Sequence, residues 1–174
     1  MGETTQLDRL ETAKGQKEAM IFTDGACLGN PGPGGYAALI RLDGKEHILT
    51  GGEPDTTNNR MEMMGAIKAL QYLPAGASAV LHSDSEYVVK GASKWLPDWK
   101  ARGWRKADRK LVLNRGFWET IDGLCQSRNV TWRWIRGHAG HPENEKVDGL
   151  ANAEARRQQL RLKPGQTADQ YSVT

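Results

Sequence analysis

The stretch AMIFTDGACLGNPGPGGYAALIRLDGKEHILTG, residues 19–51, predicts how the fold begins. Its strand-like segments are 19–23, 35–41 and 46–51. Glycines and prolines at 29–34 separate the first two segments, and the hairpin turn sequence Asp43-Gly44 separates the last two. Three neighbouring strands joined by short turns predict an antiparallel meander.

Helices and strands alternate in the rest of the chain. Apolar residues recur at helical spacing over 59–73, and Pro74 ends this predicted helix. The other predicted elements are a strand at 79–82, a short helix at 85–91, a helix at 114–128, a strand at 130–135 and a helix from Pro142 to about 161. We therefore expect an α/β fold with a five-stranded mixed sheet, an antiparallel meander plus parallel strands, flanked by helices.

The length of 174 residues suits one ordinary domain. We expect it at 18–161, between a flexible N-terminal extension, 1–17, and a flexible C-terminal tail, 162–174.

The two cysteines, Cys27 and Cys125, lie in unrelated contexts and suggest neither a disulfide framework nor a zinc site. No apolar run approaches the roughly 18 to 20 residues of a membrane span, and the first residues do not resemble a secretory signal. These features predict a cytoplasmic monomer with no membrane association and no obligate protein partner.

Positive charge is concentrated in one segment. Residues 94–115 hold eight basic and two acidic side chains, a net charge of +6, whereas the whole chain carries +3. The segment interleaves Trp95, Trp99 and Trp104 with lysine and arginine. Cations can contact phosphates while aromatic faces lie against sugars and bases, so a polyanionic partner is predicted. The alternative is a solvated loop whose tryptophans fill a small satellite core, and Trp95 and Trp99 are spaced for one helix face.

Four acidic residues occupy positions that folding alone does not readily explain. Asp24 and Asp84 each follow an apolar strand directly, and sites on α/β sheets lie at strand ends. Glu62 and Asp148 share predicted helix faces with alanines, which point toward packing surfaces. Structural alternatives exist, since Glu62 fits an Asn59-x-x-Glu62 capping box and Asp84 fits a helix N-cap.

Carboxylates gathered in a partly buried site predict a divalent metal centre. They repel one another and raise their pKa values unless cations neutralise them. Hard ions bound through oxygen, Mg²⁺ above all, suit such a site. Two ions about 3.5 to 4 Å apart can hold the attacking water and the leaving oxygen of a phosphoryl displacement, which is a phosphodiesterase mechanism.

The glycine-rich residues 32–37 formally match G-x-G-x-x-A. Pro33 lacks the N–H that a phosphate cradle would use, and the residues that follow alternate like a strand. The sequence therefore argues against dinucleotide binding.

Four motifs together resemble the type 1 ribonuclease H family in order, spacing and residue choice. They are FTDGACLGNPGPGGY (22–36), TTNNRMEM (56–63), SDSEYV (83–88) and RGHAGHPENEKVDGLA (136–151). The resemblance covers roughly residues 18–160. It implies an endonuclease that hydrolyses the RNA strand of RNA–DNA hybrids by a two-metal-ion mechanism and leaves 5′-phosphate and 3′-hydroxyl ends. Mg²⁺ would be the cofactor, and Mn²⁺ can substitute for it.

The resemblance also assigns roles in the active site. Asp24, Glu62, Asp84 and Asp148 correspond to the catalytic, metal-binding carboxylates. His138 corresponds to a mobile catalytic histidine that helps move protons or release product, for which a side chain titrating near neutrality is suited. A loop histidine without a role is the alternative for His138.

Substrate contacts are implied in three places. Cys27, Asn30, Thr57 and Asn58 would contact the hybrid, whose minor groove displays the 2′-hydroxyls that distinguish RNA from DNA. The alternative for the two asparagines is turn and cap duty. Asn144 would lie near the active-site water. The basic segment would hold the DNA strand through Trp95, Trp99, Lys100, Arg102 and Trp104.

Two positions depart from the pattern of the family, Asp98 and Glu86, and an extra negative charge near a phosphate pocket would weaken the phosphate contacts. Two other functions compete with hybrid cleavage. One is a catalytically silent hybrid-binding module, whose signature would be a lost acidic residue, and none is lost. The other is a resolvase or exonuclease of related fold, against which the glycine-rich and tryptophan-rich segments argue.

Overall fold

The structure is a computed structural model that describes residues 18–161. The predicted extension at 1–17 and tail at 162–174 lie outside the described residues. No helix in the described range is long and apolar enough to cross a membrane.

Five strands form one mixed sheet in the order β3-β2-β1-β4-β5. The strands are β1 (Glu18–Cys27), β2 (Gly32–Leu42), β3 (Lys45–Thr56), β4 (Ser78–Ser83) and β5 (Asn129–Trp134). The first three pair antiparallel, whereas β1 pairs with β4 and β4 with β5 in parallel. The predicted meander and mixed sheet are therefore confirmed. Residues 32–37, which matched the dinucleotide pattern, lie in β2 and not at a strand-to-helix turn.

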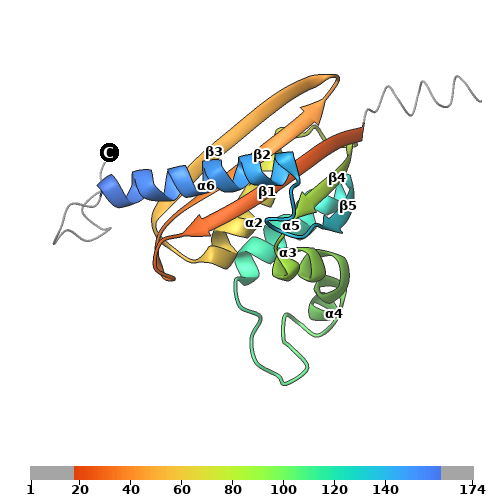
Figure 1. Ribbon diagram of the computed structural model, residues 1–174. Helices are drawn as coiled ribbons and strands as arrows, with labels where there is room; N and C mark the ends of the chain where they lie inside the picture. Colours follow the sequence, from red (N-terminus) through yellow and green to blue (C-terminus); the bar gives the residue numbers. More distant parts are fainter. Residues whose placement is uncertain (1–17, 162–174) are drawn as a thin grey trace, which may run out of the picture.

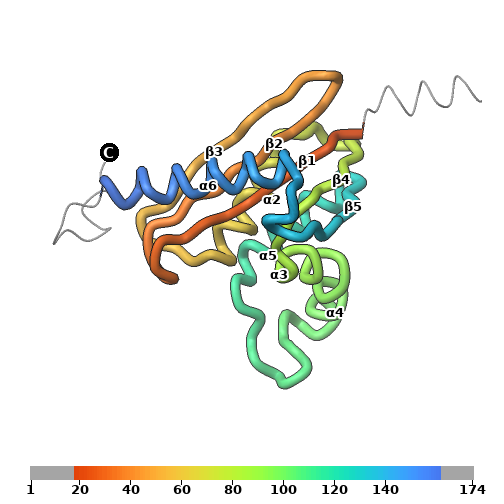
Figure 2. Tube along the Cα trace, viewed as in Figure 1, coloured from red at the N-terminus to blue at the C-terminus, as the bar shows by residue number. Residues whose placement is uncertain are grey.

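Helices cover both faces of the sheet (Figures 1 and 2). The helices are α2 (Asn58–Tyr72), α3 (Glu86–Lys90), the π-helical turn η1 (Gly91–Trp95), α4 (Leu96–Ala101), α5 (Arg115–Gln126) and α6 (Pro142–Arg161). Helix α6 crosses one face, and α2 and α5 lie on the other. Pro142 begins α6 as predicted, because a first helical residue needs no N–H partner.

Strand alternation sends apolar side chains of β1 and β2 to both faces. On the α2 and α5 face, Ile21 and Ile40 pack with helix residues that include Met63 and Trp118. On the α6 face, Leu39 packs against Val147 within a smaller cluster. With both faces buried, the sheet is fixed between the helices, and the ends of its central strands are held in register.

Candidate active site

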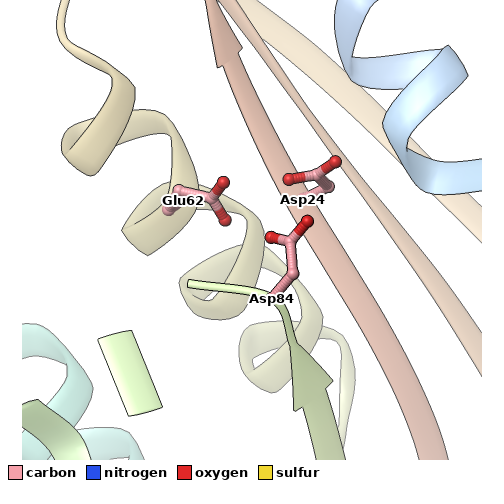
Figure 3. Close-up of side chains that lie close together, drawn as sticks. All are labelled: Asp24, Glu62 and Asp84. Atoms are coloured by element: carbon pink, nitrogen blue, oxygen red, sulfur yellow. The ribbon is translucent and has the colours of Figure 1, made fainter. Parts of the chain in front are cut away.

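Three carboxylates converge where the parallel pairing of the central strands β1 and β4 ends (Figure 3). Asp24 comes from β1, Glu62 from α2 and Asp84 from the residue after β4. One carboxylate oxygen of each lies within 4.8 Å of the others. Asp24 and Glu62 are only 3% and 4% exposed. This is the geometry of a site that gathers negative charge out of water.

The parallel pairing of β1 with β4 places Asp24 beside Asp84. That pairing runs to Thr23 opposite Ser83 and ends there. The sequence suggested that Asp24 lies at the end of its strand. It does not, because β1 continues through antiparallel pairing with β2 to Cys27. The apolar run of β1 ends at Asp24, but the backbone ladder does not.

Gly25 allows α2 to approach β1 closely enough to deliver Glu62. A Cβ on Gly25 would lie 2.3 Å from the Glu62 backbone nitrogen and 2.5 Å from the Met61 carbonyl carbon. Real Cβ atoms do not make such contacts with backbone, so α2 would have to move. The glycine after Asp24 thus sets the distance between two of the three carboxylates.

Replacing Gly25 with Ala is expected to lower phosphodiesterase activity by at least tenfold and to destabilise the fold by about 1–3 kcal/mol, the usual cost of overpacking. Phosphodiester cleavage and denaturant unfolding are the measurements. Gly123→Ala on α5 is the matched control, because a Cβ there meets nothing within 4 Å. That control should gain about 0.5–1 kcal/mol, since glycine weakens a helix interior. A Gly25→Ala protein with normal activity would contradict the close approach.

Helix capping does not account for the acids. The N-cap of α2 is Thr57, whose side chain accepts a hydrogen bond from the Arg60 backbone N–H. The N-cap of α3 is Ser85, whose hydroxyl accepts from the Val88 N–H. The alternatives of Glu62 as a capping-box partner and Asp84 as an N-cap are therefore wrong.

Burial and mutual repulsion raise the pKa values of all three carboxyls. The pKa of Asp24 rises from 3.8 to about 7, mainly by desolvation; the charge of Asp84 and a hydrogen bond with Asp148 add to the rise, and a hydrogen bond with Glu62 opposes it. The pKa of Glu62 is raised well above its ordinary value by burial and by Asp24. Burial also raises the pKa of Asp84, and its proximity to Asp148 contributes. Without a cation, protons are the means by which the site reduces its charge.

A divalent cation fits this group. Glu62 Oε2 is buried and has no hydrogen-bond partner among the described residues, which is costly for a carboxylate oxygen unless a ligand completes it. The donor set is all oxygen, which suits hard divalent ions. Asp24, Glu62 and Asp84 can therefore hold a metal.

A sequence model of the RNase H family matches residues 16–156. The chain belongs to the RNase H family. A protein named Ribonuclease H from Halorhodospira halophila is 56% identical over 131 residues, 75% of this chain and 88% of the relative. Another from Thiobacillus denitrificans is 54% identical over 132 residues, 76% of this chain and 89% of the relative. The crystal structure of LC9-RNase H1, a type 1 RNase H with the type 2 active-site motif, is 30% identical with a TM-score of 0.72, and the match covers 90% of this chain and 81% of that one.

The fourth carboxylate predicted for an RNase H site, Asp148, lies on α6 at the edge of the group. It is half-buried, and its interactions raise the pKa of both Asp24 and Asp84. Asn144, one turn earlier, is 3% exposed, and its amide lowers the pKa of Asp84. Its Nδ2 lacks a hydrogen bond of normal geometry among the described residues, so this amide can still take a partner.

Ion pairs join the start of α6 to the β2–β3 hairpin. Arg41 contacts Glu143 at 2.7 Å and Glu46 at 3.4 Å, and Lys146 contacts Glu46 at 2.8 Å. Glu143 and Lys146 flank Asn144 in the sequence. The four charges thus tie the turn that carries Asn144 to the sheet, beyond what the apolar face of α6 provides.

His138 lies in the loop before α6, exposed and in the left-handed backbone region with a φ of 56°. Its neighbour Gly137 lies against Asp84, where a Cβ would come 2.8 Å from Asp84 Oδ2. His138 also lowers the pKa of Asp84 electrostatically. The histidine is therefore near the carboxylates but free of the packed interior.

The sequence did not indicate that Trp134 supports the site. Its Nε1 donates a hydrogen bond to the Asp84 carbonyl oxygen at 3.0 Å. Gly137 supports the site in another way, because the absence of a side chain leaves room for the Asp84 carboxylate. The glycine beside the predicted histidine was a usable signal, whereas nothing in the sequence distinguishes Trp134 from other tryptophans.

The predicted hybrid-contact residues at the β1–β2 turn and at the start of α2 form one group. Asn30 Oδ1 accepts a hydrogen bond from the Asn58 backbone N–H at 3.0 Å. Cys27 Sγ lies 3.4 Å from the Thr56 carbonyl oxygen, next to the α2 N-cap Thr57. Asn30 thus has the turn-and-cap role considered as its alternative. Asn30 and Asn58 are both exposed, so they remain accessible to a ligand.

The tryptophan segment combines packing with exposure. Residues 91–101 form η1 and α4, two elements that the sequence did not predict separately. Trp99 packs edge-on against the buried Trp118 with ring centroids 5.4 Å apart, and Trp95 lies 5.7 Å from Trp99. Lys100 pairs with Asp122 of α5 at 2.9 Å, whereas Arg102 is exposed. The alternative of a loop with its own satellite core is therefore wrong for Trp99, which packs from a helix against the main core, while Trp95 stays at the surface.

Proposed function

We propose that this chain cleaves the RNA strand of RNA–DNA hybrids as an endonuclease, leaving 5′-phosphate and 3′-hydroxyl ends. The observation that carries the proposal is the convergence of Asp24, Glu62 and Asp84 within 4.8 Å in a chain of the RNase H family. The orphaned Glu62 oxygen is explained if the group binds metal. The curated relatives named Ribonuclease H support the same reaction class.

Asp24, Glu62, Asp84 and Asp148 would hold two Mg²⁺ ions, with Mn²⁺ able to substitute. Bound ions lower the pKa of water and neutralise charge that develops on the phosphate. The carboxylates fix where those charges sit, because two of them are buried and cannot turn toward solvent. Asp148, the most peripheral of the four, would complete the site when substrate is present.

His138 and Asn144 would complete the reaction chemistry. An exposed imidazole beside Asp84 can pass a proton to or from the reacting groups. The Asn144 amide, with an unused donor at the edge of the carboxylate group, can orient the attacking water. Neither role requires a change in the fold.

Substrate binding would use two surfaces. Cys27, Asn30 and Asn58 would contact the minor groove, where 2′-hydroxyls distinguish RNA from DNA, and Thr57 would contact a phosphate. The basic segment would contact the DNA strand through Trp95, Trp99, Lys100, Arg102 and Trp104. Trp99 and Lys100 would do so mainly by shaping that surface, because each already has an internal partner. The protein would act as a cytoplasmic monomer.

A cleavage assay on four matched end-labelled substrates tests the proposal. The substrates are RNA–DNA hybrid, duplex RNA, duplex DNA and single-stranded RNA, each with Mg²⁺ and with EDTA. We expect cutting of the RNA strand of the hybrid alone, and none with EDTA. Absence of hybrid cleavage with either Mg²⁺ or Mn²⁺ would overturn the proposal, and tight hybrid binding without cleavage would identify a silent binding module.

A further inference from the structure

Two exposed arginines lie over aromatic rings, one between α2 and α5 and the other between α5 and the loop before it. The Arg60 guanidinium carbon is 5.0 Å from the centroid of Phe117, and that of Arg115 is 5.4 Å from the centroid of Trp104. Arg60 is in the first turn of α2, and Arg115 is the first residue of α5. Neither arginine is needed to build the carboxylate site.

Each of the two stacks lies beside one of the two surfaces proposed to bind the hybrid. Arg60 lies in the same first turn of α2 as Asn58, three residues after the N-cap Thr57. Trp104 belongs to the basic loop between α4 and α5. Phe117 lies in the first turn of α5, where Arg60 covers it from α2, so the Arg60 stack reaches the helix that begins with Arg115. In Figure 1 this loop runs from α4 to the start of α5 and projects away from the sheet.

Stacking prepares these guanidiniums for phosphate. A guanidinium whose face rests on a ring keeps outer N–H groups available, and its planar fork matches phosphate oxygens. In Arg115 the Nε already donates to Glu119, so its terminal N–H groups remain for phosphate. Side-chain freedom is reduced before binding, so less entropy is lost when a phosphate is bound. Arg60 forms no ion pair within residues 18–161, whereas Arg115 contacts Glu119 one turn along α5.

We propose that Arg60 and Arg115 form an arginine track that binds backbone phosphates of the hybrid between the minor-groove contacts and the basic loop. The inference rests on the proposed function for the identity of the ligand. The track contacts phosphates alone, so it contributes affinity and position without reading sequence. It also lies outside the carboxylate group, so its loss should weaken binding and leave the chemical step intact.

The test measures hybrid affinity against salt concentration, by fluorescence anisotropy with a labelled hybrid in EDTA. Arg60→Gln and Arg115→Gln are each expected to weaken binding roughly five- to tenfold at 0.1 M salt. Each should also reduce the slope of log affinity against log salt by about 0.9, the value for one lost phosphate contact. The double variant should lose about twice that slope, and kcat at saturating hybrid with Mg²⁺ should stay within about twofold of the wild type.

Three matched variants separate a contact from a general charge effect. Arg157→Gln removes one exposed charge from α6, across the sheet from α2 and α5, and should leave affinity and slope unchanged. Arg115→Gln combined with Glu119→Gln keeps the net charge of the wild type and should still lose the slope. Phe117→Leu keeps Arg60 but removes its ring, and should weaken binding about twofold with the slope retained.

The outcomes separate this inference from the proposed function. A wild type that cuts the hybrid, with Arg60→Gln and the charge-neutral pair both matching Arg157→Gln, would overturn the track and leave the function standing. Loss of cleavage without loss of affinity in either arginine variant would also overturn it. Failure of the wild type to cut any hybrid is a failure of the proposed function and is read in the separate cleavage assay.

Discussion

Replacing Asp24 with Asn is expected to lower hybrid cleavage by at least about 1,000-fold, because bound metal contributes several kcal/mol and each 1.36 kcal/mol is tenfold in rate. Asp24 is central to the carboxylate group and contacts Glu62. An amide of the same shape keeps the packing but removes the charge that a metal needs. Single-turnover cleavage at saturating protein is the measurement, since it reports the chemical step without product release.

Binding and folding are expected to survive this change. Removing a negative charge near a polyanion should leave hybrid affinity equal or slightly higher, as measured in EDTA. Asp108→Asn is a matched control in the exposed loop between α4 and α5, where the carboxylate accepts a hydrogen bond from the Lys110 N–H, and its activity should stay within about twofold. A folded Asp24→Asn protein that keeps a tenth of wild-type activity would refute the assignment of Asp24.

The local periodicities of the sequence predicted most of the fold. The apolar repeat that includes Met63, Ile67 and Leu70 defines α2, and Asp43-Gly44 defines the β2–β3 turn, because both signals depend on neighbouring residues. Segment η1–α4 was missed as a helix. The spacing of Trp95 and Trp99 fitted one helix face, but the helix packs through Trp99 against Trp118, a residue distant in sequence.

The candidate site was predictable in its residues but not in its distances. Asp24 and Asp84 each follow an apolar strand segment, which indicated a site near strand ends, and the parallel pairing of β1 with β4 is what brings the two together. The approach of Glu62 depends on the absence of a Cβ at Gly25, which is seen once α2 is packed on β1. The Arg60 stack on Phe117 likewise joins helices that the sequence separates, and no local pattern signals it.

The carboxylate group should make the metal-free protein less stable as pH rises. A carboxyl whose folded-state pKa is raised adds stability that is complete below its unfolded pKa and is lost as pH rises through its folded pKa. For Asp24 these values are 3.8 and about 7, so the loss falls within that window. Glu62 and Asp84 shift in the same direction and extend the effect.

Comparison with Asp24→Asn measures the pH dependence that Asp24 brings, through its own carboxyl and through its effect on the pKa of Glu62, while more distant titrating groups act in both proteins. In EDTA, the free energy of unfolding of the wild type should fall by about 3 kcal/mol relative to Asp24→Asn between pH 5 and pH 8, at 1.36 kcal/mol per pKa unit. Urea unfolding at the two pH values gives both numbers. A difference between the two proteins that does not change with pH would contradict the raised pKa of Asp24.

Divalent metal should reverse the loss, and this links stability to the proposed chemistry. A cation that binds the folded state adds RT ln(1 + [metal]/Kd), about 2.7 kcal/mol at one hundred times Kd. Because protons compete for the same carboxylates, Mg²⁺ should stabilise the wild type more at pH 8 than at pH 5 and should affect Asp24→Asn far less. Equal stabilisation of both proteins would show that the ion binds elsewhere. The repulsion that weakens the empty site is therefore the same property that gives it affinity for metal, and activity and stability should recover over one range of metal concentration.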